Sequence, residues 1–376
     1  MNASGESAAQ PRDVNDGASG ALSLVLTIAV ISNWRSGFQP DSANNLPGCL
    51  FAKPARRQAR RSSVMWMIAA IAVLLPSVVM AFTPPNEKTI RDAIGDLSGL
   101  PVVLQRAFAP DHDSFDSIPK PGPNDWLAVH QEPGQTFDEF KISQPNRPTH
   151  SRRFIYLQLL GDFAPERSPS IDKLREFAGA FFSMEVKALS PIKIDNEKFT
   201  TRRNPNTGNP QILTGDVLNF LKARVPADAF CILAITMEDL YPEPSWNFVF
   251  GQASLRDRVG IYSFARYDPV FYGEPRATGC ETLLLRRSCK VLAHETGHMF
   301  GLAHCTYFNC LMNGSNHLAE SDRCPLHLCP VCLRKLQWNI GFDVVERYTA
   351  LERVNRAAGF TDEADWLSRR IKTVRE

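Results

Sequence analysis

The stretch HETGHMFGLAHCTYFNCLM, residues 294–312, decides the fold and the chemistry expected of this chain. His294 and His298 are four residues apart, so on a helix both imidazoles project from one face. Gly301 suits the left-handed end of such a helix, and His304 follows directly after that turn. Three imidazoles leave the fourth position of a tetrahedral zinc ion for water, which is the pattern of catalytic zinc sites and not of structural ones.

Glu295 is the residue of this motif that could accept a proton during catalysis. It lies next to the first histidine and can reach a water held by the same metal. Zinc lowers the pKa of bound water, so a neighbouring carboxylate can accept its proton and pass it to the leaving amine. The motif therefore predicts hydrolysis of a peptide bond with Glu295 as general base. The alternative is a catalytically weak zinc-binding interaction module, which could be tethered to a membrane and has no physical need for that carboxylate.

The cysteines predict a second metal site. Five of the nine cysteines fall between residues 305 and 332. Cys305 and Cys310 form one pair and Cys329 and Cys332 another, with spacings compatible with zinc. Four thiolates close the coordination sphere, so this zinc would be structural. Buried thiols or, in an oxidising compartment, two disulfides are the alternatives, and Cys324 is a substitute ligand that we do not expect to be used.

Alternating helical and strand-like patterns follow one another after residue 82, which predicts an α/β fold with helices packed on a sheet. A helical pattern and a connector occupy 82–108. Strands are expected at 152–163, 184–192, 229–241, 245–254 and 260–268; helices are expected after the capping residue Ser170 and at 214–226 and 281–302, with two more within 343–374, broken around Gly359.

The N-terminal part of the chain differs in composition from the rest. Residues 1–63 are predicted to be an extension of low order. Residues 64–82 contain no charged side chain and would span about 28 Å as a helix, so they are a candidate transmembrane or signal-anchor segment. Four arginines precede this segment and would keep the N-terminus cytoplasmic. An internal apolar helix and a secretory signal are the alternatives. Residues 83–376 are assigned to one catalytic domain.

The charge and composition of the chain bear on which partners it is expected to bind. The formal net charge is +2, and no long basic stripe is present, so nucleic acid is not an expected partner. A peptide or small protein is the expected substrate, and a membrane is a possible partner only through residues 64–82. Clustered thiols favour a reducing cytosol over single-pass membrane anchoring. The sequence does not indicate an oligomeric state.

The motif also supports a resemblance to a known family. H-E-x-x-H-x-x-G-x-x-H followed by a methionine is the metzincin pattern. With C-x4-C-x-M directly attached and C-x-x-C downstream, the chain resembles the archaemetzincin zinc metallopeptidases over roughly residues 90–352, and the animal members most closely.

The resemblance implies two zinc ions per chain. It implies a catalytic zinc on His294, His298 and His304, with Glu295 as base, and a structural zinc on Cys305, Cys310, Cys329 and Cys332. Met312 would be the Met-turn residue beneath the histidines; simple core packing is the other interpretation of this methionine.

The resemblance further implies a compact metzincin-like zincin domain with a mixed twisted sheet, an active-site helix and C-terminal helices. A substrate cleft would lie below an edge strand, for which WNFVFGQAS, residues 246–254, is the candidate. Aminopeptidase and endopeptidase action share this metal chemistry, and the sequence does not decide between them.

Overall fold

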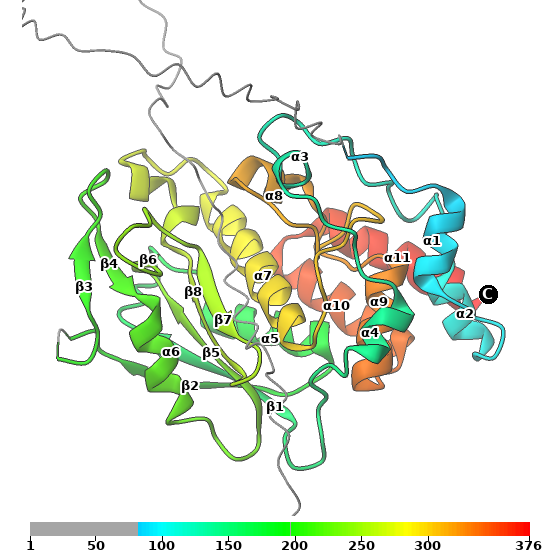
Figure 1. Cartoon of the computed structure of the whole chain (residues 1–376), viewed down its shortest axis with the longest axis horizontal. Helices are drawn as coiled ribbons and strands as arrows, with labels where there is room; N and C mark the ends of the chain where they lie inside the picture. The colour runs from blue at the N-terminus through cyan, green and yellow to red at the C-terminus, as the bar shows by residue number, and fades with distance from the viewer. Residues whose placement is uncertain (1–81, 196) are drawn as a thin grey trace, which may run out of the picture.

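A five-stranded mixed sheet organises the part of the chain that the computed structural model describes, residues 82–195 and 197–376 (Figure 1). The strand order is β2-β1-β5-β8-β7. The first four strands of this order run parallel, and β7 pairs antiparallel with β8 at one edge. The strands are β1 Phe154–Leu160, β2 Val186–Ile192, β5 Ala229–Thr236, β7 Gly251–Ser254 and β8 Val259–Ser263.

A small second sheet corrects one sequence prediction. The expected strand 229–241 is two strands, because the chain leaves the main sheet after Thr236 and re-forms as β6, Asp239–Tyr241. There it pairs parallel with β4, Pro210–Leu213, which is also antiparallel to β3, Thr201–Arg203. Burial does not distinguish the two strands, since both are fully buried although β6 begins with the charged Asp239.

The central strands of the main sheet are buried on both faces, which explains why they are mostly apolar. Along β1, Ile155 and Leu157 enter the larger core, whereas Tyr156 and Leu160 enter a second, smaller core on the opposite face. The smaller core contains apolar residues of α6, and the larger one contains those of α5, α7 and the C-terminal helices. The mixed α/β prediction is therefore confirmed.

Helices make up the rest of the regular secondary structure, and α7 lies between the sheet and the C-terminal helices (Figure 1). Ser170 accepts a hydrogen bond from the Lys173 backbone and caps α5 as predicted. The two predicted C-terminal helices are present and separated by Gly359 in the left-handed conformation. The helices are α1 Glu87–Ile94, α2 Val102–Phe108, α3 Trp126–Val129, α4 Phe137–Ile142, α5 Ile171–Phe182, α6 Thr214–Lys222, α7 Cys280–Met299, α8 Leu318–Arg323, α9 Pro330–Ile340, α10 Val344–Ala358 and α11 Thr361–Arg375, with short 3₁₀ turns at Ala265–Tyr267 and Pro269–Tyr272.

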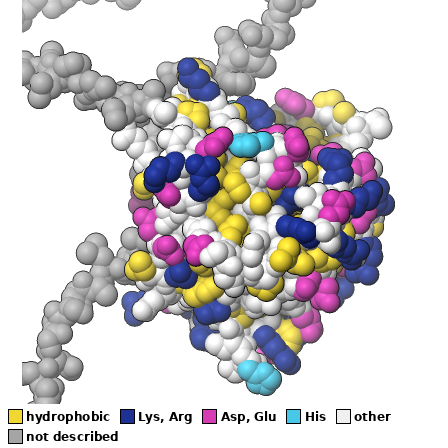
Figure 2. Space-filling view, turned by 90° about the vertical axis from the view of Figure 1, so that its right-hand side faces the viewer, with side chains coloured by type: hydrophobic (Ala, Val, Ile, Leu, Met, Phe, Trp, Pro, Cys, Tyr) yellow, Lys and Arg dark blue, Asp and Glu magenta, His cyan; other side chains and the backbone are white. Residues whose placement is uncertain are grey.

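The N-terminal predictions lie outside this region. Residues 1–63 and, apart from Phe82, residues 64–82 are not among those that the structure describes. Within 82–195 and 197–376, none of the helices combines the length and the apolar character that crossing a bilayer requires. The face shown in Figure 2 carries basic and acidic side chains intermixed, which agrees with the nearly balanced net charge.

Candidate active site

The helix that carries the first two histidines ends as its sequence predicts. α7 runs from Cys280 to Met299, and Gly301 follows it with a φ of 86°. The backbone N–H of Leu302 donates to Gly297 O at 3.2 Å, and that of Gly301 donates to His298 O at 2.8 Å. These two bonds form a Schellman motif, which turns the chain back toward the helix. The turn brings His304 to the face of α7 that carries the other two imidazoles.

The three imidazoles converge on one point. Their ligand atoms lie within 4.8 Å of one another, and the Nε2 atoms of His294 and His298 are 3.0 Å apart. Nδ1 of His294 lies 2.9 Å from Leu311 O, and Nδ1 of His298 lies 2.6 Å from Leu302 O. A carbonyl oxygen only accepts, so in both rings Nδ1 carries the hydrogen and Nε2 presents its lone pair.

Such an arrangement fits a cation. Burial lowers the pKa of His294 to about 3 and that of His298 well below its usual value, with repulsion from neighbouring imidazoles as a second cause. Both rings are therefore neutral at pH 7, and their lone pairs face each other. Zinc–nitrogen bonds of about 2.0–2.1 Å place tetrahedral ligands roughly 3.3 Å apart, close to the observed Nε2 separation.

Glu295 lies on the same turn of α7 and lines the cavity beside the histidines. Its side chain is buried, and Oε2 has no hydrogen-bond partner among the described residues. Burial raises the pKa of this carboxyl to about 8. A buried carboxyl oxygen without a hydrogen-bond partner costs free energy unless a bound molecule donates a hydrogen bond to it. A water or substrate held at the histidines would do so.

Glu132 is a residue of the site that the sequence patterns did not predict. Glu132, in the loop after α3, lies 2.9 Å from Nδ1 of His304 through Oε1 and 3.1 Å through Oε2. Burial is the largest single influence and would raise the pKa of Glu132, but the hydrogen bond from His304 and the attraction of nearby imidazoles together outweigh it and lower the pKa. Carboxylates that hold the outer nitrogen of a metal-binding histidine fix its orientation and increase its basicity.

The methionine of the opening stretch packs against the same helix turn. Met312 is fully buried, and a Cβ added to Gly297 would lie 2.7 Å from its sulfur. The glycine in the HETGH motif therefore makes room for the thioether against the turn of α7 that carries His294 and His298. The assignment of Met312 as the Met-turn residue stays a prediction.

The four cysteines of the predicted second site come together as a buried group. Cys305, Cys310, Cys329 and Cys332 place their sulfur atoms within 4.8 Å of one another, and Cys305 Sγ lies 3.6 Å from Cys329 Sγ. All eight cysteines of the described residues are free thiols. The sulfur of Cys324 instead approaches Asn313 and the Glu320 carbonyl, outside the group.

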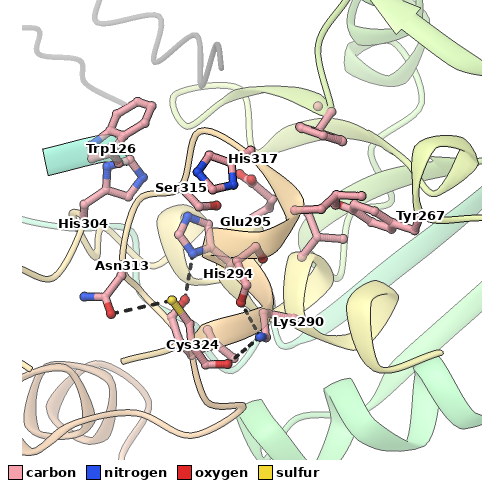
Figure 3. Close-up of a pocket in the computed structure, with 16 residues that line it drawn as sticks. Trp126, Tyr267, Lys290, His294, Glu295, His304, Asn313, Ser315, His317 and Cys324 are labelled. Carbon is pink, nitrogen blue, oxygen red and sulfur yellow. Dashed lines mark hydrogen bonds between the residues drawn. The ribbon is translucent and has the colours of Figure 1, made fainter. Parts of the chain in front are cut away.

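A cavity opens at the histidines (Figure 3). His294, Glu295 and His304 line it, and Phe250 and Gly251 bring the start of β7 to its wall. The predicted edge strand is thus an edge strand beside the cavity, although only residues 251–254 are extended. Lys290, one turn before His294, also lines the cavity and was not anticipated as a site residue.

Comparison with known proteins agrees with this geometry. The sequence profile of Peptidase family M54 matches residues 211–338. Archaemetzincin-2 of Macaca fascicularis is 46% identical over 282 residues, which cover 67% of this chain and 77% of that protein. The chain belongs to the archaemetzincin family.

Other relatives extend the comparison. Archaemetzincin-1 of Mus musculus is 34% identical over 67% of this chain and 56% of its own length. The crystal structure of the archaemetzincin of Methanopyrus kandleri is 32% identical, covers 51% of this chain and 97% of its own, and has a TM-score of 0.41. As an archaemetzincin, the protein is a zinc-dependent metallopeptidase, a hydrolase that acts on peptide or protein substrates.

Proposed function

We propose that this archaemetzincin hydrolyses peptide bonds at the cavity formed by α7 and β7, with Glu295 as general base. His294, His298 and His304 would hold the catalytic zinc through their Nε2 atoms. When bound there, zinc polarises the substrate carbonyl, lowers the pKa of a water and favours the ionised form of the neighbouring carboxylate. The observation that carries the proposal is the unpartnered, buried Oε2 of Glu295 beside three converging imidazoles.

The side chains of the protein supply the remaining steps. Glu295 accepts the proton of the attacking water and donates it to the leaving amine, and its burial keeps competing solvent away. Glu132 holds the imidazole of His304 in orientation through its carboxylate. The free edge of β7 can pair with an extended peptide backbone and align it across the cavity.

We further propose a structural zinc on Cys305, Cys310, Cys329 and Cys332, which gives two zinc ions per chain. The donor set supports this assignment, because four buried sulfurs without disulfides form a closed soft-ligand sphere. Hydrogen bonds from the other three thiols lower the pKa of Cys305 although burial opposes the shift. One thiolate is therefore stabilised in the group even before a cation is considered.

The test of the proposed base is Glu295→Ala. The variant should retain two zinc ions by metal analysis and lose peptide hydrolysis by at least about a hundredfold. Glu281→Gln, which changes an exposed carboxylate in the first turn of the same helix, is the matched control and should hydrolyse peptides normally. A Glu295→Ala protein that cleaves peptides like the parent would refute the mechanism. Paired peptides with free and acetylated N-termini will distinguish aminopeptidase from endopeptidase action.

A further inference from the structure

A buried lysine lines the active-site cavity. Lys290 is 5% exposed and lines the cavity together with His294, which lies one helical turn further along α7. The two side chains share one face of the helix and are separated by roughly 6 Å along its axis. In Figure 3 the ammonium lies beside the backbone at the end of α8, where the Ser321 and Cys324 carbonyls accept its hydrogen bonds.

No carboxylate of the described residues pairs with this ammonium. Asp322 is bound by Arg287, with atoms 2.6 Å apart, and Glu363 is bound by His327 at 2.8 Å and by Arg286 at 3.2 Å. Among the described residues, the charge of Lys290 is therefore stabilised by hydrogen bonds to two backbone carbonyls and by no carboxylate. The partial negative charge at the end of a six-residue helix does not offset a full buried charge.

The ammonium also has unused hydrogen-bonding capacity. A lysine ammonium has three donors, and two are used by the carbonyls. The third has no acceptor among residues 82–195 and 197–376. Val291, Leu311 and Leu318 add apolar surface to the cavity that Lys290 lines. This combination suits an aliphatic stem that ends in a carboxylate.

We propose that Lys290 is a specificity-determining residue that binds a substrate carboxylate on the leaving-group side of the scissile bond. This inference rests on the proposed peptidase function of the same cavity. Two sources share the required chemistry: an acidic side chain of the residue after the cleaved bond, and the C-terminal carboxylate of a short peptide. Both place a carboxylate within a few ångströms of the cleaved amide, as the one-turn separation from His294 requires.

Two pairs of internally quenched peptides separate these sources. The first pair has glutamate or glutamine directly after the cleaved bond and an amidated C-terminus. The second pair has a neutral residue there and ends with either a free carboxylate or an amide. In the wild-type protein we expect kcat/KM to be about tenfold to a hundredfold higher for the carboxylate member of at least one pair. The pair that shows the preference identifies the source, and equal values in both pairs overturn the proposal.

Lys290→Met tests whether this residue causes the preference. The substitution retains the aliphatic stem and removes the charge, so the ratio within the preferred pair should fall to about one. Lys335→Met is the matched control, because Lys335 is another buried lysine that donates to Gln135 and does not line the cavity. It should alter stability while leaving the ratio unchanged. A preference that survives in Lys290→Met overturns the proposal.

A binding measurement separates failure of this inference from failure of the proposed function. Glu295→Gln is expected to bind peptides without cleaving them, so calorimetric titration with the same two pairs requires no turnover. The carboxylate member of the preferred pair should bind about tenfold or more tightly to Glu295→Gln, and this advantage should disappear in the double variant with Lys290→Met. If the wild-type protein cleaves no peptide, the proposed function is wrong. In that case, equal affinities within both pairs overturn the inference, and a lost advantage in the double variant supports it.

Discussion

Removing the charge of Glu132 should weaken zinc binding at the histidine site without altering the fold. The His304 side chain is 10% exposed and that of Glu132 is 27% exposed, so the contact between them is largely shielded from water. Loss of such a carboxylate partner typically reduces metal affinity or activity by about 10- to 100-fold. Glu132→Gln retains an acceptor oxygen at nearly the same place and loses only the charge. We therefore expect a decrease of about tenfold, or ~1.4 kcal/mol.

Glu132→Ala should be more severe, because it leaves the buried Nδ1–H of His304 without an acceptor. An unsatisfied buried donor costs about 1–3 kcal/mol, so the affinity decrease should approach 100-fold. Competition between the protein and a calibrated chelator measures both values. Glu139→Gln is the matched control, since glutamine at this position preserves the capping box of α4. Equal zinc affinities for the wild-type protein and both Glu132 variants would refute the assigned function of this carboxylate.

Three further predictions concern the surroundings of the site. Gly297→Ala should reduce hydrolysis about tenfold or more and lower the melting temperature, because its new Cβ would meet the Met312 sulfur at 2.7 Å; unchanged kinetics would contradict this contact. Cys332→Ser should remove one zinc per chain by metal analysis, whereas Cys324→Ser should retain both; equal zinc content in the two variants would contradict the ligand assignment. Arg266→Met should destabilise the fold by about 3–5 kcal/mol in urea unfolding, because it leaves the buried carboxylate of Asp239 without its cation; a change below about 1 kcal/mol would show that the pair contributes little.

The parts of the site that depend on helix geometry were predictable from the sequence. Positions 294, 295 and 298 lie within little more than one turn, and Gly301 is the natural residue for the left-handed end of the helix. Local rules alone therefore place His304 near the other two histidines. Lys290 also lies one turn before His294, so the same periodicity could have put it on the cavity face. No spacing rule, however, could show that its charge lacks a carboxylate.

The parts that depend on long-range packing were not predictable. Glu132 precedes His304 by 172 residues and lies in a loop with no periodic pattern, so only the fold brings the two side chains together. The division of the expected strand 229–241 has the same cause, because both halves are buried, and tertiary pairing sends them to different sheets. The edge position of β7 was expected from its resemblance to known proteins, but its short extended region was not.

The two proposed metal sites are adjacent in the sequence. Cys305 directly follows His304, and its backbone N–H donates to Met312 O at 2.8 Å. Asn313 closes the same loop through its amide, which donates to the Cys305 carbonyl at 2.7 Å. Zinc on the four sulfurs would therefore fix the segment that positions both the third imidazole and the methionine beneath the histidines. Because the third histidine enters from outside α7, its alignment depends on this loop, and a zinc ion on the cysteine group would stabilise the proposed catalytic geometry without touching the substrate.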